Sequence, residues 1–466
     1  RKGNVKNSIS VHIFLGDSLV TNDTGVEHHL QNIPDEIGYG RIRDALRSKS
    51  EIAYQGAVQR LDNKRTQLKQ NPKPADNAAV PEFKRMPPAV WIGPSALTNP
   101  CPVTDMEQLS NRLSKVFSDY PELFNHCVKV YQKRVDYYRL TSEGQKILQP
   151  DTVFHITARA SIKTDGNEVK TEYYRLHVGG INDLPSEDAL IGELHRFAEY
   201  MQQKSRAKAV EDLYIGPVLY EDDAAMELLA EKIADYSHSF WISIRNQSDR
   251  KHRYLGKQVF PPALSVCQLG NDSVYNGVKL LGYRQVDADG TKPMTLPIIE
   301  KGILKHMLTG RIPSLGCPAS TGNEHFDGLS RTLETRYTAG VFHVTSNRPV
   351  PYSKLYKRFL KAAKKAGLEH TYIIRKNRTS PYALIRVDLS TGKEELVEGN
   401  YNSPSHEQFK RMHAISKEEN VYNLDPSGGK GLGIISPKAI LLEDMELDIT
   451  PNRARHIDEA FYELRH

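Results

Sequence analysis

The chain has 466 residues, 39% of them hydrophobic and 26% charged, with a formal net charge of +6. This length exceeds a single simple core, so we expect at least two domains. The small positive charge is spread along the chain and does not indicate a nucleic-acid-binding protein. No apolar run approaches the roughly eighteen residues that a membrane helix needs. The composition is typical of a soluble globular protein.

The first part of the chain predicts one strand, one long helix and a connecting loop. Polar and apolar residues alternate from Ser8 to Leu15, which favours a half-buried strand, and the polar stretch from Asn22 to Gly40 predicts turns. Apolar residues form a stripe from Arg41 to Gln70 and predict an amphipathic helix. The prolines of Asn71–Met86 favour an extended surface loop.

The next segment predicts helices that flank an antiparallel sheet. We expect short helices at Asp105–Val116 and Pro121–Val128, and a longer helix at Ser186–Lys208. Between them, Val130–Leu140 and Thr152–Ile162 alternate well and predict antiparallel strands.

A strand at Leu213–Tyr220 and a helix at Asp222–Tyr236 open the second half. We place the main domain boundary near Tyr214, which divides the chain into residues 1–213 and 214–466. Further strands are expected at Gln258–Leu269, Tyr337–Val344, Tyr372–Arg375, Ala383–Val387 and from Ile434 to Leu447, with a basic helix at Tyr352–Gly367.

Two apolar runs, Met294–Ile299 and Ile303–Leu308, are separated by a short segment that contains Gly302. A short gap with glycine between two β-rich runs predicts a hairpin. The small polar residues from Ser320 to Asn323 predict a surface loop after it. This hairpin and loop are the centre of the second domain.

Five short motifs occur in an order that resembles the TldD/PmbA family of metallopeptidase-related, DNA-gyrase-modulator-like proteins. They are Gly216-Pro-Val-Leu219, Asp287-Ala-Asp-Gly290, Ile299-Glu-Lys-Gly-Ile-Leu-Lys305, Ser320-Thr-Gly-Asn323 and Ile434-Ile-Ser-Pro437. The resemblance implies an α+β fold. Its N-terminal domain is of α/β type, with long helices and antiparallel strands and with its start missing here, and its C-terminal domain is β-rich.

Active members of this family carry a His-Glu-x-x-x-His zinc motif on the helix after the Val-Leu strand. The aligned positions here read Ala-Glu-Lys-Ile-Ala-Asp, from Ala230 through Glu231 to Asp235. Alanine cannot ligate zinc, and one aspartate without a histidine partner is a poor site. We therefore expect no zinc or other metal cofactor, and these degenerate positions leave the catalytic residues unknown.

Other groupings of metal-ligating residues are weak. The cysteines Cys101, Cys127, Cys267 and Cys317 form no Cys-x-x-Cys pair, and whether any are bridged stays open. His306, Cys317 and His325 cluster around the predicted hairpin and loop and are kept as an unconventional metal or catalytic site. A helix-like segment from Ser405 to Ala414 would place His406 and His413 on one side, too far apart for one metal.

The resemblance implies a peptide groove beside the Ser320-Thr321-Gly322-Asn323 loop, with Arg311 as a further candidate. Our first hypothesis is a peptide-binding or partner subunit in peptide processing, without its own zinc site. The alternatives are a peptidase that uses an unconventional site and a structural homodimer or scaffold.

The implied partners are a peptide or protein substrate and a second subunit, as a homodimer or as a heterodimer with a related chain. Nucleic acid and a membrane span are not expected. The family implies a cytoplasmic location. An exported or periplasmic location stays open because the sequence begins at Arg1 without a methionine, so that an earlier segment is expected to precede it.

Overall fold

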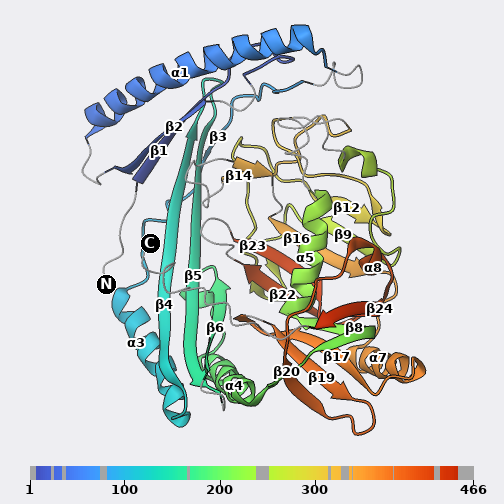
Figure 1. The fold of residues 1–466 in the computed structure, drawn as a ribbon. Coiled ribbons are helices and arrows are strands. Elements are labelled where there is room, and N and C mark those ends of the chain that lie inside the picture. The colour runs from blue at the N-terminus through green and yellow to red at the C-terminus, as the bar shows by residue number, and fades with distance from the viewer. Residues whose placement is uncertain are drawn as a thin grey trace.

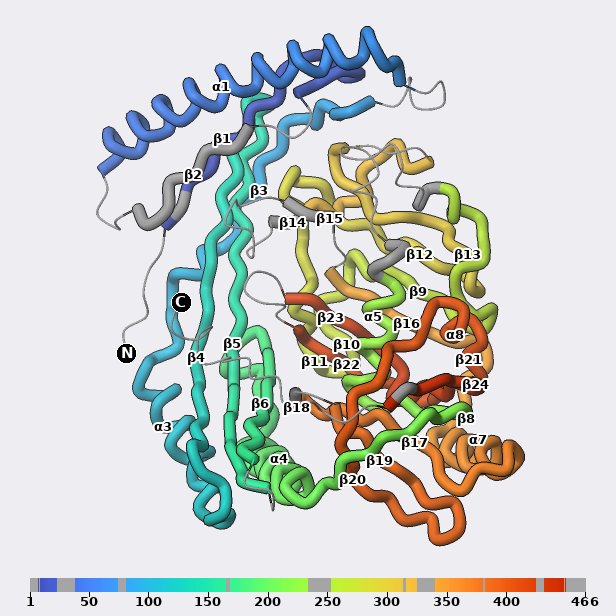
Figure 2. The backbone as a smooth tube through the Cα atoms, in the orientation of Figure 1, coloured from blue at the N-terminus to red at the C-terminus, as the bar shows by residue number. Residues whose placement is uncertain are grey.

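The computed structural model describes residues 7–22, 26–33, 38–73, 81–164, 168–237, 251–312, 316–326, 335–337, 340–380, 382–424 and 431–449. A long antiparallel hairpin runs along one side of the molecule, a long helix lies across one end of it, and the β-rich C-terminal half lies on the other side (Figure 1). The tube in Figure 2 follows the same path and shows the chain crossing from the hairpin side into the C-terminal half after α4.

The N-terminal unit is a two-stranded hairpin covered by one helix. Strands β1 (Asn7–Ile13) and β2 (Val26–Ile33) pair antiparallel, and α1 (Tyr39–Gln70) packs on them. Ala53 and Ala57 are fully buried against β1, which confirms the predicted amphipathic helix. The prediction of turns throughout Asn22–Gly40 is wrong for β2, because pairing with β1 stabilises a strand that the polar sequence does not reveal.

The second layer is a five-stranded sheet, made of a path of four strands and one added strand. Its order is β18-β6-β5-β3, and β4 pairs with β5. The bounds are β3 Val90–Ile92, β4 Phe124–Leu140, β5 Lys146–Lys163, β6 Val169–Val178 and β18 Thr379–Ser380. The helices α3 (Val103–Ser114) and α4 (Glu187–Arg206) contact it. Phe117, Phe154 and Phe197 lie in their shared core, which excludes water from this layer.

The predicted helix at Pro121–Val128 is wrong. The chain enters β4 at Phe124, and Val128 is buried in the core beside α3 and α4. Strand β4 pairs with almost the whole of β5, and this pairing sets where β4 begins. The local helical spacing of the sequence is too weak to compete with so many strand contacts.

The C-terminal half contains a six-stranded sheet of order β13-β12-β9-β16-β23-β22 and a seven-stranded sheet of order β21-β24-β8-β17-β19-β20-β7. The first sheet comprises β9 Leu264–Gln268, β12 Leu296–Glu300, β13 Ile303–Leu304, β16 Val341–Ser346, β22 Glu419–Leu424 and β23 Leu432–Pro437. The second comprises β7 Lys208–Ala209, β8 Asp212–Asp222, β17 His370–Lys376, β19 Ala383–Asp388, β20 Glu394–Glu398, β21 Met412–Ile415 and β24 Ala439–Ile449.

Among the described residues of this half, three helices and two small hairpins accompany these sheets. The helices are α5 Asp223–Ser237, α7 Tyr352–Lys365 and α8 His406–Lys410. The hairpins are β10 Val274–Tyr275 with β11 Val278–Lys279, and β14 Glu324–Phe326 with β15 Thr335–Tyr337. Short 3₁₀ turns lie at Lys115–Asp119, Ile181–Asp183 and Lys251–Tyr254.

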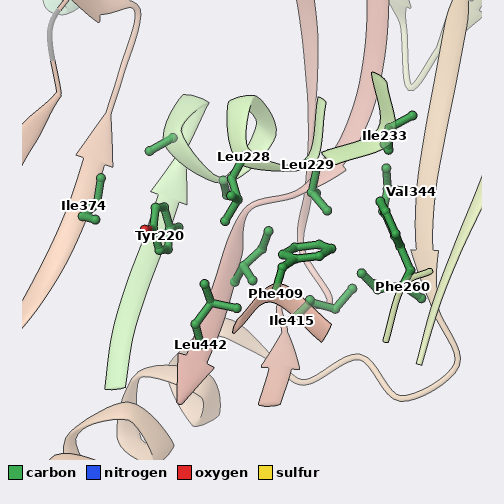
Figure 3. Packing of buried hydrophobic residues seen from close by; sticks show 14 of the residues in the cluster. Tyr220, Leu228, Leu229, Ile233, Phe260, Val344, Ile374, Phe409, Ile415 and Leu442 are labelled. Atoms are coloured by element: carbon green, nitrogen blue, oxygen red, sulfur yellow. The ribbon is translucent and has the colours of Figure 1, made fainter. Parts of the chain in front are cut away.

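The largest core joins α5 to both C-terminal sheets. Leu228, Leu229 and Ile233 point from α5 toward Phe260 and Phe409 and toward side chains of the two sheets (Figure 3). Phe260 and Phe409 are fully buried and their rings meet edge-on at 5.1 Å. Each such ring contributes roughly 1.5–3 kcal/mol by its removal from water. The core therefore fixes the position of the helix on which the zinc motif of the resembling family lies.

The predicted central hairpin is confirmed as β12 and β13. Its turn residues Lys301 and Gly302 both have positive φ, 47° and 80°, as a tight two-residue hairpin turn requires. A Cβ at Gly302 would approach the carbonyl oxygen of Phe260 to 2.3 Å, so the turn also needs glycine for close packing.

The mixed helices and sheets confirm the predicted α+β fold class. The division at residue 213 stays a prediction, and it falls within β8. The helix-like segment Ser405–Ala414 is shorter than predicted: α8 ends at Lys410 and His413 lies on β21. Pairing of β21 with β24 ends the helix there. Among the described residues, no helix has the length and hydrophobicity to cross a membrane.

Candidate functional site

Helix α5 holds the positions that align with the zinc motif. Its first residues follow Asp222, which has a positive φ of 54°, and its buried face packs on β8, β17 and β23. Ala230 is half-buried, Glu231 is exposed and Lys232 is buried. The backbone of Asp235 lies in α5, but its side chain is outside the described residues. Glu231 is therefore the one carboxylate at the aligned positions whose side chain the structure describes.

Glu231 is already held by two neighbours. Its Oε1 accepts from the Lys232 ammonium at 2.7 Å, and its Oε2 accepts from the Ser403 hydroxyl at 3.1 Å. The Lys232 side chain is only 5% exposed, so its positive charge is fixed beside this carboxylate. A zinc ion needs several neutral or negative donors, and a buried ammonium repels it. The donor set at this position does not fit zinc.

A tyrosine cluster, defined as Tyr220, Tyr382 and Tyr401, lies near the same helix. The Tyr382 and Tyr401 rings are 5.8 Å apart, and the Lys376 ammonium lies 5.3 Å from the Tyr382 ring centre. Lys376 also forms an ion pair with Glu227 of α5. Burial raises the pKa of all three phenols, and nearby Glu231 adds to this effect, so they remain neutral donors at neutral pH.

The Ser320–Asn323 loop is tied to the segment before it by side-chain hydrogen bonds. Thr321 Oγ1 accepts from the Thr309 backbone N–H at 2.8 Å and donates to the Thr309 carbonyl at 3.0 Å. Gly322 has a φ of +73°, and a Cβ there would lie 2.4 Å from the Lys292 carbonyl oxygen. These hydrogen bonds and the close packing at Gly322 therefore fix the conformation of the loop. Its two hydroxyl residues, Ser320 and Thr321, are partly exposed.

Asn323 lies beneath this loop and is completely buried. Its amide and the amide of Gln268 exchange two hydrogen bonds, both 2.8 Å long. Gln268 lies on β9, so this pair fastens the loop to the central sheet. Because both amides are satisfied by each other, they are not available to a ligand.

Arg311 belongs to a buried acid–arginine network, defined as Arg139, Glu143, Asp289, Arg311 and Glu324. Arg139 contacts both Asp289 and Glu324 at 3.2 Å. Arg311 forms ion pairs with Glu143 and, at 3.6 Å, with Asp289. Burial raises the pKa of Asp289, the Glu324 charge adds to that rise, and Arg139 opposes it. Since β4 supplies Arg139, the network joins the N-terminal sheet to the C-terminal half.

The structure therefore separates the predicted site residues into two groups. Ser320 and Thr321 remain partly accessible, whereas Gly322, Asn323 and Arg311 are buried. The assignment of these residues to a peptide groove stays a prediction. The sequence did not indicate the roles of Arg139, Glu143 and Lys232. The one signal near them was the Asp287–Gly290 motif, whose Asp289 contacts Arg139 of β4.

The other candidate metal ligands are histidines and cysteines, and only some of their side chains are described. His306 hydrogen-bonds through Nδ1 to the Pro297 carbonyl at 2.7 Å, and His413 lies 3.2 Å from Glu443. The side chain of His325 is outside the described residues. No disulfide joins the four cysteines. Within the described ranges, no group of three or more His, Cys, Asp or Glu side chains is arranged to hold a metal ion.

The fold and the central motifs define a metallopeptidase-like α+β protein. Residues 215–349 match the family described as the PmbA/TldA metallopeptidase C-terminal domain. The predicted resemblance to the TldD/PmbA family is thus confirmed, with the family match lying within the C-terminal half of the chain. No curated protein matches the sequence.

Three solved structures share the fold of almost the whole chain. A candidate modulator of a DNA gyrase from Thermotoga maritima has a TM-score of 0.61 at 14% identity, with 95% of this chain and 93% of that chain covered. TldE from Thermococcus kodakarensis has a TM-score of 0.54 at 11% identity, with 95% and 94% covered. A candidate DNA gyrase modulator from Bacteroides thetaiotaomicron has a TM-score of 0.57 at 14% identity, with 91% and 86% covered. At these identities the likeness concerns the fold alone.

Proposed function

We propose that the chain is a peptide-binding or partner subunit of a peptide-processing assembly and has no zinc site of its own. The observation that carries this proposal is the Lys232 ammonium, buried 2.7 Å from Glu231 at the position of the zinc motif. It supplies a fixed positive charge where a metallopeptidase needs a divalent cation and an activated water. The family relationship supports the link to peptide chemistry.

The loop beside the hairpin supports the binding half of the proposal. Thr309 and Asn323 hold the Thr321 side chain in place, and the Thr309 hydroxyl also accepts from the Thr321 backbone N–H at 3.1 Å. A preformed loop loses little conformational entropy when a ligand binds. The Ser320 hydroxyl suits hydrogen bonding to the backbone of an extended peptide, whereas the Thr321 hydroxyl holds the loop through Thr309 and Asn323.

Metal analysis of the purified full chain tests the absence of zinc. We expect zinc far below one equivalent per chain after growth in zinc-supplemented medium, and no chelator-sensitive cleavage of a mixed peptide library. One full equivalent of zinc together with chelator-sensitive peptidase activity overturns the proposal. Cleavage that persists in chelator supports an unconventional catalytic site instead.

Thr321→Val tests the role of the loop in binding. It removes the hydroxyl that bonds to Thr309 and to Asn323. We expect weaker capture of library peptides by the variant than by the native chain. Thr391→Val is the matched control, because that hydroxyl bonds only within a remote exposed turn at Asp388. Equal peptide capture by both variants contradicts a groove at this loop, and no capture by the native chain favours a scaffold.

A further inference from the structure

A second polar cluster lies on the other face of the six-stranded sheet. Cys267 of β9 is the direct antiparallel partner of His343 of β16. Their neighbours Val266 and Val344 point into the main core, so the alternation of strand side chains places Cys267 and His343 together on the opposite face. Directly paired residues have Cβ atoms about 4.5–5.5 Å apart.

The imidazole of His343 is oriented by a carboxylate. Its Nε2 lies 3.0 Å from Glu419 Oε1, and the Tyr275 hydroxyl donates to Glu419 Oε2 at 2.7 Å. The Tyr275 ring meets the imidazole edge-on at 5.3 Å. An ionised carboxylate only accepts hydrogen bonds, so Nε2 carries the proton and Nδ1 keeps its lone pair. Glu419 thereby leaves His343 with a basic nitrogen and stabilises the imidazolium that forms on protonation.

Cys267 is a half-buried thiol that is not in a disulfide. Its Sγ donates to the carbonyl of Gln268 at 3.3 Å. Burial and the nearby Asp272 charge raise the pKa of this thiol, so it rests in the protonated form. A resting thiol of this kind becomes nucleophilic only when a neighbouring base accepts its proton. Among the charged groups described around the cluster, Asp272 acts on Cys267, whereas Glu419 acts on His343.

We propose that Cys267, His343 and Glu419 form a thiol-modification site that reacts with small-molecule disulfides. His343 Nδ1 accepts the thiol proton as Cys267 Sγ attacks one sulfur of the disulfide. A new sulfur–sulfur bond forms between Cys267 and that half, the original disulfide bond breaks, and the released thiolate takes the proton from the imidazolium. Cys267 is oxidised to a mixed disulfide while the released half is reduced. Glu419 is a positioning residue for the imidazole.

Cys101 is the matched control for this reaction. Burial and a nearby aspartate, Asp105, raise its pKa in the same way, but it lies outside any strand and has no cross-strand histidine. Oxidised glutathione serves as the disulfide probe, applied to the intact chain, and mass spectrometry measures the rate at each cysteine. We expect Cys267 to react about tenfold faster than Cys101. A rate at Cys267 no higher than that at Cys101 overturns the proposal.

His343→Gln and Glu419→Gln separate chemistry from folding. We expect the glutamine at 343 to lower the Cys267 rate to that of Cys101. Glu419→Gln should lower the Cys267 rate less than His343→Gln does, because it removes the carboxylate that orients the imidazole but leaves the imidazole in place. Local unfolding would change the Cys267 rate in the opposite direction, since it exposes the thiol and makes it react faster. An unchanged or increased rate in His343→Gln therefore contradicts the proposal. The result is independent of peptide binding and zinc content.

Discussion

Two regions of this chain align with family motifs, and they differ sharply in how the chain uses its charges. On α5, Glu231 is 53% exposed and contacts Lys232 and Ser403. In the acid–arginine network, the Asp289 side chain is fully buried and meets two arginines. The first region holds a local ion pair on one helix, whereas the second holds the N-terminal sheet against the C-terminal half. The comparison teaches that an exposed pair of neighbouring charges contributes little to the fold, whereas buried charges from distant segments hold its parts together.

Arg139→Ala should have the largest effect on stability. It removes the cation shared by Asp289 and Glu324 and leaves two buried carboxylates without it. Breaking such a buried pair costs about 3 kcal/mol or more in the free energy of unfolding. Thermal and urea unfolding measure the loss. Arg386→Ala is the control, because its pair with Glu395 is exposed and is expected to contribute less than about 1 kcal/mol. Equal losses in both variants would remove the contrast between the two regions.

Asn323→Ala should be the next most damaging change. It leaves the buried Gln268 Oε1 without the donor that Asn323 supplies, while Gln268 Nε2 keeps its 3.3 Å bond to the Met294 carbonyl. The unsatisfied amide oxygen costs about 2 kcal/mol in the free energy of unfolding, which the same unfolding experiments can measure. We also expect faster proteolysis near the Ser320 loop. A loss confined to peptide capture, with stability intact, would instead mean that Asn323 serves the ligand rather than the fold.

Asp223→Asn tests whether the first turn of α5 holds a buried charge of its own. Burial raises the pKa of Asp223 to about 6, although the Arg378 backbone N–H opposes this rise. The folded state therefore binds more protons than the unfolded state between pH of about 4 and 6. The stabilising contribution of the protonated form is lost as the pH rises through this window. The variant should flatten this decline by on the order of 1 kcal/mol, as measured by unfolding at a series of pH values. An unchanged pH slope contradicts the role of Asp223.

Glu231→Gln should have the smallest effect. The side chain is half exposed and its ion pair with Lys232 is local, so we expect a change in stability below about 0.5 kcal/mol. Zinc content and any peptidase activity should also stay unchanged. A variant that loses a measurable activity would give Glu231 a catalytic role and would erase the difference between α5 and the acid–arginine network.

Local patterns in the sequence predicted much of the fold. The stripe of apolar residues predicted α1, and regular spacing also predicted α4, α5 and α7. The glycine between two apolar runs predicted the β12–β13 hairpin. The strand β2 and the start of β4 were missed because partner strands, rather than local propensity, stabilise them.

The candidate site was less accessible to sequence reasoning. The loss of both histidines on α5 is visible in the sequence alone, and so is the Ser320–Asn323 loop. The environment of Arg311 could not be predicted from the sequence, because its partner Glu143 is 168 residues away along the chain. The fixed position of the Lys232 charge beside Glu231 also required the packing of α5 against the core.

The sequence by itself determined the α+β class, the order of motifs and the residues that replace the zinc ligands, because these depend on local spacing and residue chemistry. Only the tertiary structure decided which polar residues are buried, which charges neutralise one another and which thiol faces a histidine. Those properties depend on the register in which strands pair and on the packing of the sheets against segments that are distant in the sequence. The pairing of Cys267 with His343, and of Arg139 with Glu324, exists only once that closure has occurred.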